Sequence, residues 1–185
     1  MTFAERVVGA LKLDANTFED IERDTTAMGQ AVGIIALAAA ASSLGSIWYL
    51  GFGRILFAVL ISLCAYLLWA VLVWVVGTKV MPDPQTSADF AETFRVIAFA
   101  SAPGLFGAIS IIPILGTIIA WLLTPIIWVW SMAAMVIATR QVLDYAETFK
   151  AVIVVLIGFV VYLVFWGTMM MLTFGAAVMG GMMSR

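Results

Sequence analysis

Long apolar runs separated by short polar segments form the main pattern of the chain. Residues 29–50 contain no charged side chain, and neither do residues 55–76. At about 1.5 Å per residue, a run of this length makes about 33 Å of helix, which matches a bilayer core of about 30 Å. The pattern therefore predicts two transmembrane helices, over 29–50 and 55–76.

A longer run without charges covers residues 96–139. As one helix it would measure about 66 Å, twice the thickness of the bilayer core. Pro113 is the natural corner of a hairpin inside this run, because proline cannot continue the hydrogen bonding of a helix. We therefore expect one span over 94–112 and another over 114–138. The last apolar run predicts a fifth span over 151–173.

Residues 1–27 have a different character, because nine of the first 24 side chains are charged. Capping-box spacings that begin at Thr2 and Asn16 predict two short amphipathic helices. Helices this short are marginal in water, so we expect them to lie on the bilayer surface or to dock on the bundle. The predicted organisation is a cytosolic segment over 1–27 and a membrane domain over 28–185.

The composition agrees with an all-α integral membrane protein that has five transmembrane helices and short N-terminal surface helices. Hydrophobic residues make up 64% of the chain and charged residues 11%, against about 45–50% and about 25% in soluble domains. A net charge of −2 excludes a basic nucleic-acid-binding protein, and the chain has no His to act as a base or metal ligand. No nucleophile–base pair lies inside the predicted spans, so we expect no catalysis, no metal and no cofactor.

The basic residues predict the orientation in the membrane. Five spans place the two termini on opposite sides of the bilayer. With the N-terminus inside, seven of the nine Lys and Arg residues fall on the inner side, and only Arg54 and Arg185 fall on the outer side. Because basic residues are enriched in cytoplasmic loops, we expect a cytosolic N-terminus and a C-terminus on the opposite side of the membrane.

A seven-residue motif occurs twice, at the predicted starts of spans three and five. In each copy the Asp can cap the helix, the Glu three residues later can reach back to the cap, and the basic residue lies on the same face. Two interpretations stay open: similar helix starts, or a duplicated element that packs spans three and five in parallel about a pseudo-symmetry axis. The candidates for a structural or partner-facing role are Asp89, Glu92 and Arg95 in the first copy and Asp144, Glu147 and Lys150 in the second.

Small residues recur along one side of the first span, at alternating spacings of four and three. Such a stripe, which includes a GxxxG motif, lets two helices approach closely. It predicts either a packing contact inside the bundle or the interface of a homo-oligomer. The residues are Gly29, Gly33, Ala36, Ala40 and Ser43.

Prolines interrupt the hairpin of spans three and four. Pro103 and Pro125 each remove a backbone hydrogen bond and predict a kink, and Pro113 predicts the corner. The kinks can serve packing, with Ser101 and Thr124 satisfying the freed backbone groups. Alternatively, they can break a helix so that it lines a ligand site.

Four segments carry a likeness to a known family: Glu5–Lys12, Thr17–Glu22, Glu92–Pro103 and Ala146–Lys150. Their order resembles the Yip-one domain family of membrane proteins, in its prokaryotic form. The likeness extends over about residues 25–173 and implies five spans with a cytosolic N-terminus. Eukaryotic relatives bind Rab-type GTPases and act in vesicle traffic. They have a long cytosolic N-terminal region and an Asp-Leu-Tyr-Gly-Pro motif. Neither occurs in this sequence, which makes a GTPase partner doubtful, and no functional residue is carried over.

Two classes of function stay open. One is a non-catalytic scaffold or adaptor in a bacterial inner (plasma) membrane, which presents its charged cytosolic face to a protein partner. The other is a small transporter, channel or lipid-handling protein that uses the proline-kinked hairpin. The gathering of charges on the inner side favours the first class, whereas Pro103 and Pro125 favour the second. In both classes the lipid bilayer is a partner.

Overall fold

The computed structural model describes residues 1–183. Within this range it describes every side chain except those of residues 49–50, 54, 117, 165–167, 169–170 and 172–183. The described chain consists of helices joined by turns and loops, and it contains no β-strand. Two short helices come first, α1 (Phe3–Leu11) and α2 (Ala15–Arg23), followed by the 3-10 turn η1 (Thr25–Ala27).

The membrane part is built from longer helices and a few short turns. Its elements are α3 (Met28–Ser43), η2 (Leu44–Ser46), α4 (Ile47–Leu50), α5 (Gly53–Val75), the π-helical turn η3 (Val76–Val80), α6 (Phe90–Phe99), the 3-10 helix η4 (Ala102–Ile111), α7 (Leu115–Val142) and α8 (Thr148–Met183).

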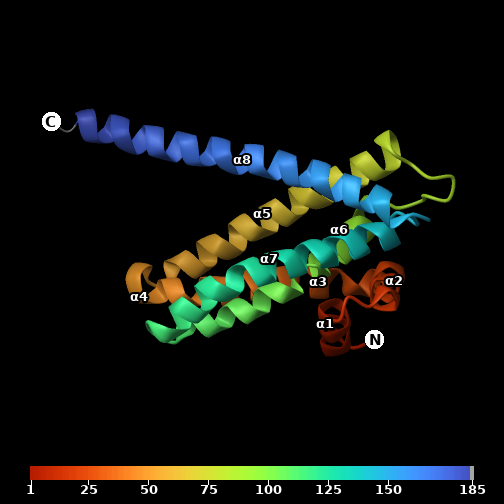
Figure 1. Ribbon diagram of the computed structural model, residues 1–185, viewed down its shortest axis with the longest axis horizontal. Helices are drawn as coiled ribbons and strands as arrows, with labels where there is room; N and C mark the ends of the chain where they lie inside the picture. The colour runs from red at the N-terminus through yellow and green to blue at the C-terminus, as the bar shows by residue number, and fades with distance from the viewer. Residues whose placement is uncertain (184–185) are drawn as a thin grey trace.

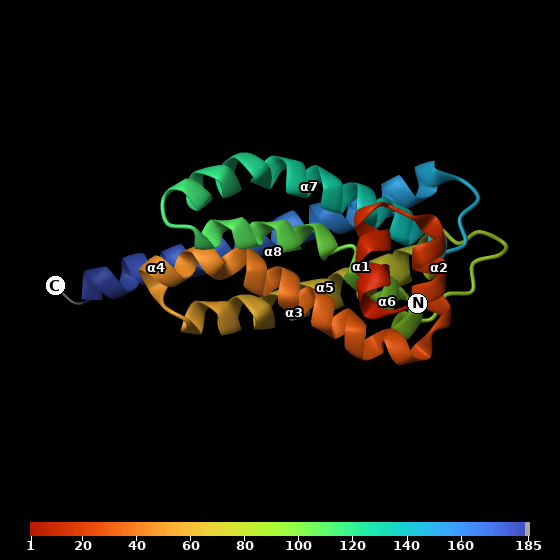
Figure 2. The same cartoon turned by 90° about the horizontal axis from the view of Figure 1, so that it is seen from below.

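The long helices run roughly along one axis, with the N-terminal helices at one end (Figure 1). α3, α5, η4 and α7 pack together, whereas α8 contacts them near its own start and diverges toward the C-terminus. Figure 2 shows α1 and α2 across the end of the bundle, next to α6. α2 contacts both α6 and α7, so the N-terminal segment docks on the bundle.

Three helical stretches are long and apolar enough to cross a bilayer: Thr25–Ser46, Ile55–Val80 and Ile118–Val142. The pair of α6 and η4 is a fourth candidate, with a bend of about 40° at its break. The apolar stretch Thr148–Val164, in the described part of α8, is shorter than these. The fold is therefore all-α, with three to four candidate membrane spans among the described residues.

The predicted third span is interrupted, as Pro103 indicated. α6 ends at Phe99 and η4 begins at Ala102, with Pro103 in its first turn. Proline is tolerated there because the first N–H groups of a helix have no intrahelical acceptor. The Ser101 hydroxyl donates to the Ala98 carbonyl at 2.7 Å and satisfies one backbone group at the end of α6.

η4 is a ten-residue 3-10 helix, which is long for this type of helix. With three residues per turn, every third residue lies on one line. On η4 this line consists of small residues, and it packs on an equally small face at the end of α3. A Cβ added to Gly107 would lie 2.7 Å from the Ser42 Cα, so only glycine fits there. The small-residue contact is formed by Gly104, Gly107 and Ser110 against Ala38, Ser42 and Gly45.

Two hydrogen bonds cross the small-residue contact. The Ser42 hydroxyl donates to the Gly104 carbonyl at 3.0 Å, and the Gly45 N–H donates to the Ser110 hydroxyl at 2.9 Å. In hydrocarbon no water is present to replace these partners. Each hydrogen bond therefore avoids the free-energy cost of an unpaired polar group. The contact thus combines close packing with paired polar groups.

The stripe predicted on α3 does not pack inside the bundle at Gly29 and Gly33, so that interpretation was wrong, whereas the homo-oligomer interface stays a prediction. A Cβ added to either glycine would meet no atom within 4 Å. The buried face of α3 instead contains Ile34 and Ile35. Burial of a large aliphatic side chain contributes about 1.5–3 kcal/mol, so the two isoleucines decide which side faces the bundle. The remaining stripe residues, Ala36, Ala40 and Ser43, are partly buried beside that face.

The turn predicted at Pro113 is confirmed, because it joins η4 to α7. Ile114 follows it with a φ of 59°, in the left-handed region. Pro125 lies inside α7, which runs on through it as one helix. The Thr124 hydroxyl donates to the Ala120 carbonyl at 2.8 Å, one turn earlier in the same helix.

We expect Gly107→Ala to destabilise the protein and Gly33→Ala to be tolerated. At position 107 the added methyl group presses against the α3 backbone, and overpacking of this kind costs about 1–3 kcal/mol. At position 33 it meets open space, and alanine favours a helix over glycine by about 0.5–1 kcal/mol. Thermal unfolding in detergent measures both variants. Equal melting temperatures would show that η4 does not lie against α3.

Candidate functional site

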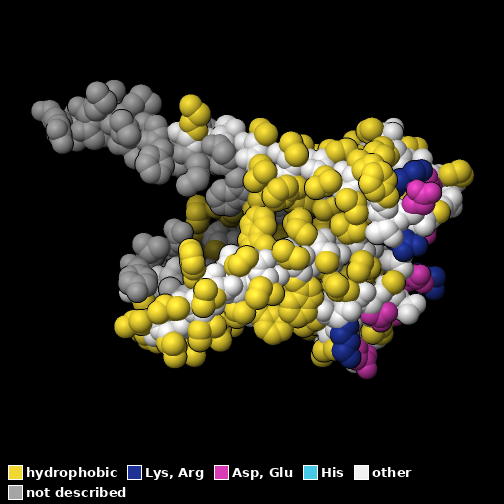
Figure 3. All heavy atoms as spheres, viewed as in Figure 1, with side chains coloured by type: hydrophobic (Ala, Val, Ile, Leu, Met, Phe, Trp, Pro, Cys, Tyr) yellow, Lys and Arg dark blue, Asp and Glu magenta, His cyan; other side chains and the backbone are white. Residues whose placement is uncertain are grey.

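The charged side chains gather at one end of the molecule, and the rest of the visible surface is largely hydrophobic (Figure 3). This polar end consists of α1, α2, the loop of residues 81–89 and the turn of residues 143–147. A surface divided in this way suits a protein whose long helices face lipid while one end faces water.

Arg6 connects the N-terminal helices to α3. Its side chain is only 1% exposed. Its guanidinium donates to Asp20 of α2 at 2.8 Å, to Asp24 at 2.6 Å and to Gln30 of α3 at 2.9 Å. A buried guanidinium is tolerated only when it is paired and hydrogen-bonded. The position of α1 is therefore tied to both α2 and α3.

Asp24 shares this network and also caps the turn after α2. Its carboxylate accepts from the Thr26 N–H at 2.9 Å and from the Thr26 hydroxyl at 2.6 Å. The hydrogen bonds from Thr26, and then the one from Arg6, hold the pKa of Asp24 well below its usual value. The carboxylate therefore stays ionised and paired at any pH near neutrality.

Side chains of the bundle satisfy the ends of both N-terminal helices. Arg95 of α6 donates to the Glu22 carbonyl at 2.7 Å, and the indole N–H of Trp130 donates to the Leu11 carbonyl at 3.0 Å. Both carbonyls lie in the last turn of a helix, where no intrahelical N–H is available. In each docked helix, a carbonyl group of the last turn thus accepts a hydrogen bond from a side chain of the bundle.

Arg95 does not lie exposed beside Glu92, as the motif predicted. α2 covers this part of α6, so the Arg95 side chain is 4% exposed and reaches the backbone of Glu22 instead. Its Nε has no hydrogen-bond partner among the described residues. The buried Arg95 side chain therefore connects α6 to α2, and its charge is not available at the surface.

The loop of residues 81–89 is held against the turn of residues 143–147. Two hydrogen bonds tie the loop to this turn, and an ion pair ties it to the first turn of α8, so neither segment is a free loop. The hydrogen bonds run from the Thr86 hydroxyl to the Leu143 carbonyl at 2.7 Å and from the Gln85 amide to the Asp144 carbonyl at 2.9 Å, and the ion pair joins Lys150 to Asp83.

The first copy of the repeated motif forms the predicted capping box. The Asp89 N–H donates to the Glu92 carboxylate at 2.9 Å, and the Glu92 N–H donates to the Asp89 carboxylate at 2.7 Å. Both carboxylates also lie at the positive end of the α6 dipole, which favours their charge. These two residues therefore have a structural role at the start of α6.

The second copy is not a helix start, and this prediction was wrong. Asp144 lies in the turn after α7 with a φ of 51°, and α8 begins only at Thr148. The neighbours of Asp144 decide this, because Leu143 and Tyr145 are both buried. The Tyr145 hydroxyl donates to the Met81 carbonyl at 2.8 Å, and burial raises the pKa of Tyr145 to about 12. A tight turn between two anchored side chains leaves Asp144 at the surface.

The interpretation of the motif as a duplicated element is wrong for the same reason. Glu147 is exposed and precedes α8, so it cannot close a capping box at the start of that helix. Lys150 pairs with Asp83 rather than with Glu147. The likeness of the two copies lies in the sequence and does not extend to their conformation.

Four carboxylates influence one another where α2 meets α6 and the turn after α7: Glu19, Glu22, Glu92 and Asp144. Burial raises the pKa of Glu22 to about 7, and repulsion from Asp144 and Glu92 adds to this rise. Burial also raises the pKa of Asp144, followed by repulsion from Glu19 and Glu92. Arg23 offsets part of the repulsion in both cases. The polar end therefore concentrates negative charge around α2.

Sequence reasoning missed the residues that build the polar end, namely Arg6, Asp20, Asp24 and Asp83. One signal was present for Arg6, because it lies three residues after Phe3 and beside Val7 on the apolar face of α1. An arginine on such a face needs a buried acceptor. The sequence does not show which of the many nearby carboxylates supplies it.

Comparison with family models gives a match to the Yip1 domain over residues 10–181. The chain belongs to the Yip1 domain family. The match covers nearly the whole chain, so the resemblance stated from its sequence segments is confirmed. A search of curated proteins found no match, and a search of solved structures found none. The Yip1 domain here extends from the end of α1 into α8, and includes most of the polar end.

Replacing Arg6 with Met should loosen α1 and α2 from the bundle of longer helices. Asp24 loses its cationic partner, and Asp20 keeps the N-terminal ammonium group at 3.6 Å. Their side chains are 32% and 34% exposed, so water compensates in part. We expect a loss of about 1–3 kcal/mol, measured by thermal unfolding, with faster hydrogen exchange in α1 and α2. The matched control is Arg23→Met, which removes a pair that is 79% exposed at the arginine and should change stability by less than about 0.5 kcal/mol. Equal effects of the two changes would contradict the role of Arg6.

Glu22→Gln should remove a pH dependence of stability. The folded-state pKa of about 7 exceeds the usual 4.5. Between these values the folded state binds more protons than the unfolded state, so stability falls as the pH rises through this window. The Gln variant should have a flatter profile in unfolding experiments between about pH 5 and 8, and should exceed the wild type at the alkaline end. Exposed Glu147→Gln is the control; a wild-type slope in the Glu22 variant would show that Glu22 titrates normally.

Proposed function

We propose that this Yip1 domain protein is a non-catalytic membrane adaptor, which anchors itself in the bilayer and docks a protein partner on its polar end. The observation that carries the proposal is that the polar end is a fixed surface. The buried Arg6 joins three segments, and the loop of residues 81–89 is tied to the turn after α7. A preorganised surface loses less entropy on binding than a flexible tail does.

The charge around α2 indicates which partner chemistry fits. Burial raises the pKa of Glu22, and repulsion from Asp144, Glu92 and Glu19 adds to this rise. A partner segment rich in Lys or Arg would relieve the repulsion and gain favourable ion pairs at an exposed edge. A basic protein segment is therefore the partner class that we propose.

The proposed placement in the membrane has five spans: α3, α5, the α6–η4 pair, α7 and α8. The N-terminus and the polar end then face the cytosol of a bacterial cell, at its inner membrane, and the C-terminus lies on the other side. The distribution of Lys and Arg supports this orientation, and the gathering of charges at one end in Figure 3 agrees with it.

Site-specific photo-crosslinking in native membranes tests the adaptor proposal. A photoreactive amino acid replaces Arg23, which is 79% exposed at the polar end, or Ile114, which is 73% exposed at the opposite turn. We expect a defined protein adduct from position 23 and none from position 114. The adduct should weaken in the charge-neutralised Glu19→Gln/Asp144→Asn variant and persist in Lys79→Gln. Equal adducts at 23 and 114, or an adduct that ignores the charge change, would contradict the proposal.

The alternative is a small transporter, channel or lipid-handling protein that uses the proline-containing hairpin. The break at Pro103 supports it, since broken helices line ligand sites in transporters. Against it stands the small-residue contact, which fills the space between η4 and α3 and leaves no room there for even a methyl group at Gly107. The adaptor is therefore the better supported of the two functions.

A further inference from the structure

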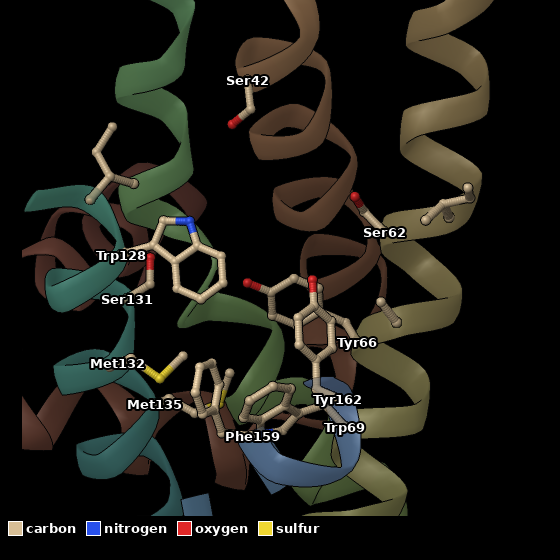
Figure 4. Close-up of a pocket in the computed structure, with 13 residues that line it drawn as sticks. Ser42, Ser62, Tyr66, Trp69, Trp128, Ser131, Met132, Met135, Phe159 and Tyr162 are labelled. Atoms are coloured by element: carbon tan, nitrogen blue, oxygen red, sulfur yellow. The ribbon is translucent and has the colours of Figure 1, made fainter. Parts of the chain in front are cut away.

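A cavity of about 300 Å³ lies between α5, α7 and α8 (Figure 4). A second space of about 330 Å³ adjoins it between α3 and α5, and the two share Ser42, Ser62 and Tyr66. Ligand pockets begin at about this size. The cavity is separate from the polar end, and an inference about it does not depend on the proposed adaptor function.

The cavity lies near the middle of the bilayer in the proposed placement. Ser131 stands eleven residues before the end of α7, Tyr66 nine before the end of α5, and Tyr162 fourteen after the start of α8. At about 1.5 Å per residue, these side chains lie about 14–21 Å from the inner helix ends. Half of a bilayer core is about 15 Å. Only molecules that dissolve in hydrocarbon are abundant at this depth.

The hydroxyl groups gather in one part of the cavity wall. In Figure 4 Ser42, Ser62, Tyr66 and Ser131 lie around its upper part together with the indole of Trp128, whereas Met132 and Phe159 lie below them. The lining residues come from four helices, so the hydroxyls are brought together by the fold and not by a local sequence motif. The wall therefore matches a molecule with one oxygen-bearing group and an apolar chain.

Two of these hydroxyls differ from the others in the membrane part. The hydroxyls of Ser43, Ser101 and Thr124 donate to carbonyls one turn earlier in the chain. Ser62 and Ser131 make no such bond to another residue of the described chain, although both lie on regular helices. An unpaired hydroxyl in hydrocarbon is unfavourable. A ligand that brings an oxygen atom would supply the missing partner.

The residues that line the cavity also exclude a charged ligand. None of the described residues that line the cavity is charged. A phosphate or ammonium group would have to leave water without gaining an opposite charge, which costs far more than a few hydrogen bonds return. A hydroxyl or ester group carries no such penalty.

We propose that the cavity between α5, α7 and α8 binds an uncharged lipid that carries a hydroxyl or ester group, of the diacylglycerol class. The oxygen-bearing end is held by the hydroxyls of Ser62, Ser131 and Tyr66. The hydrocarbon chain lies along Met132 and Phe159 and continues into the bilayer where α8 diverges from the bundle.

The test uses the full chain in phosphatidylcholine vesicles that contain a diacylglycerol with a photoreactive group in one acyl chain. After irradiation, peptide mapping should place the label on the α7 segment that contains Met132 and on the α8 segment that contains Phe159. Unlabelled diacylglycerol should compete, and the anionic lipid phosphatidylglycerol should not. Equal competition by the two lipids would overturn the assignment to an uncharged ligand, and so would labelling spread evenly over the lipid-facing helices.

A matched pair of variants separates recognition from general lipid contact. Ser62→Ala/Ser131→Ala removes two hydroxyls and keeps the shape of the cavity, so labelling should fall about fourfold or more, at about two- to tenfold for each lost hydrogen bond. Thr124→Val/Thr168→Val removes two hydroxyls that bond to their own helices, and labelling should stay at the wild-type level. Unchanged labelling in the Ser variant, or cross-linked dimers of the chain in place of a lipid adduct, would contradict the proposal. If the Ser variant fails to fold, the competition experiment on the wild type decides alone.

Discussion

The close approach of η4 to α3 is the constraint on which the arrangement of the membrane part depends. Two helices without large side chains between them can bring their backbones together, and the resulting contact is stabilised by packing and by hydrogen bonds. In the 3-10 helix η4, three residues per turn place Gly104, Gly107 and Ser110 on one line, which faces α3. The contact also fixes the start of the Pro113 turn, and α7 then packs back on η4.

A second constraint operates at the other end of the molecule, and it is electrostatic. Arg6 cannot be buried without its three acceptors, and those acceptors come from α2, the turn after it and α3. The membrane part is thus held by the absence of side-chain bulk, whereas the polar end is held by charge pairing. Charge pairing suits the polar end, because ion pairs need some access to water. Small-residue packing suits the membrane part, because it needs none.

Periodicity and charge gaps predicted much of the fold, and they failed where burial of particular side chains decided the outcome. The capping box at Asp89 and the turn at Pro113 were predictable, because each follows from local chemistry alone. The same local reasoning failed at Asp144, where the anchoring of Leu143 and Tyr145 in the rest of the fold overrides the capping pattern. It also failed at Gly33, since a stripe of small residues does not tell which side of a helix the neighbouring isoleucines will turn inward. The cavity at Ser62 and Ser131 was beyond prediction, because its residues are far apart in sequence and meet only in the folded bundle.

The separation of contacts along the chain has a consequence for how this protein is made. All three acceptors of Arg6 lie within 24 residues of it, so α1 and α2 can pair before the later helices have been made. Their attachments to the bundle span much longer distances, 73 residues from Glu22 to Arg95 and 119 from Leu11 to Trp130. Because long loops close more slowly than short ones, we expect α1 and α2 to pair first, with Arg6 already bonded to Asp20 and Asp24. We expect this pair to dock on the bundle only after α6 and α7 have formed, because the Arg95 and Trp130 donors lie on those helices.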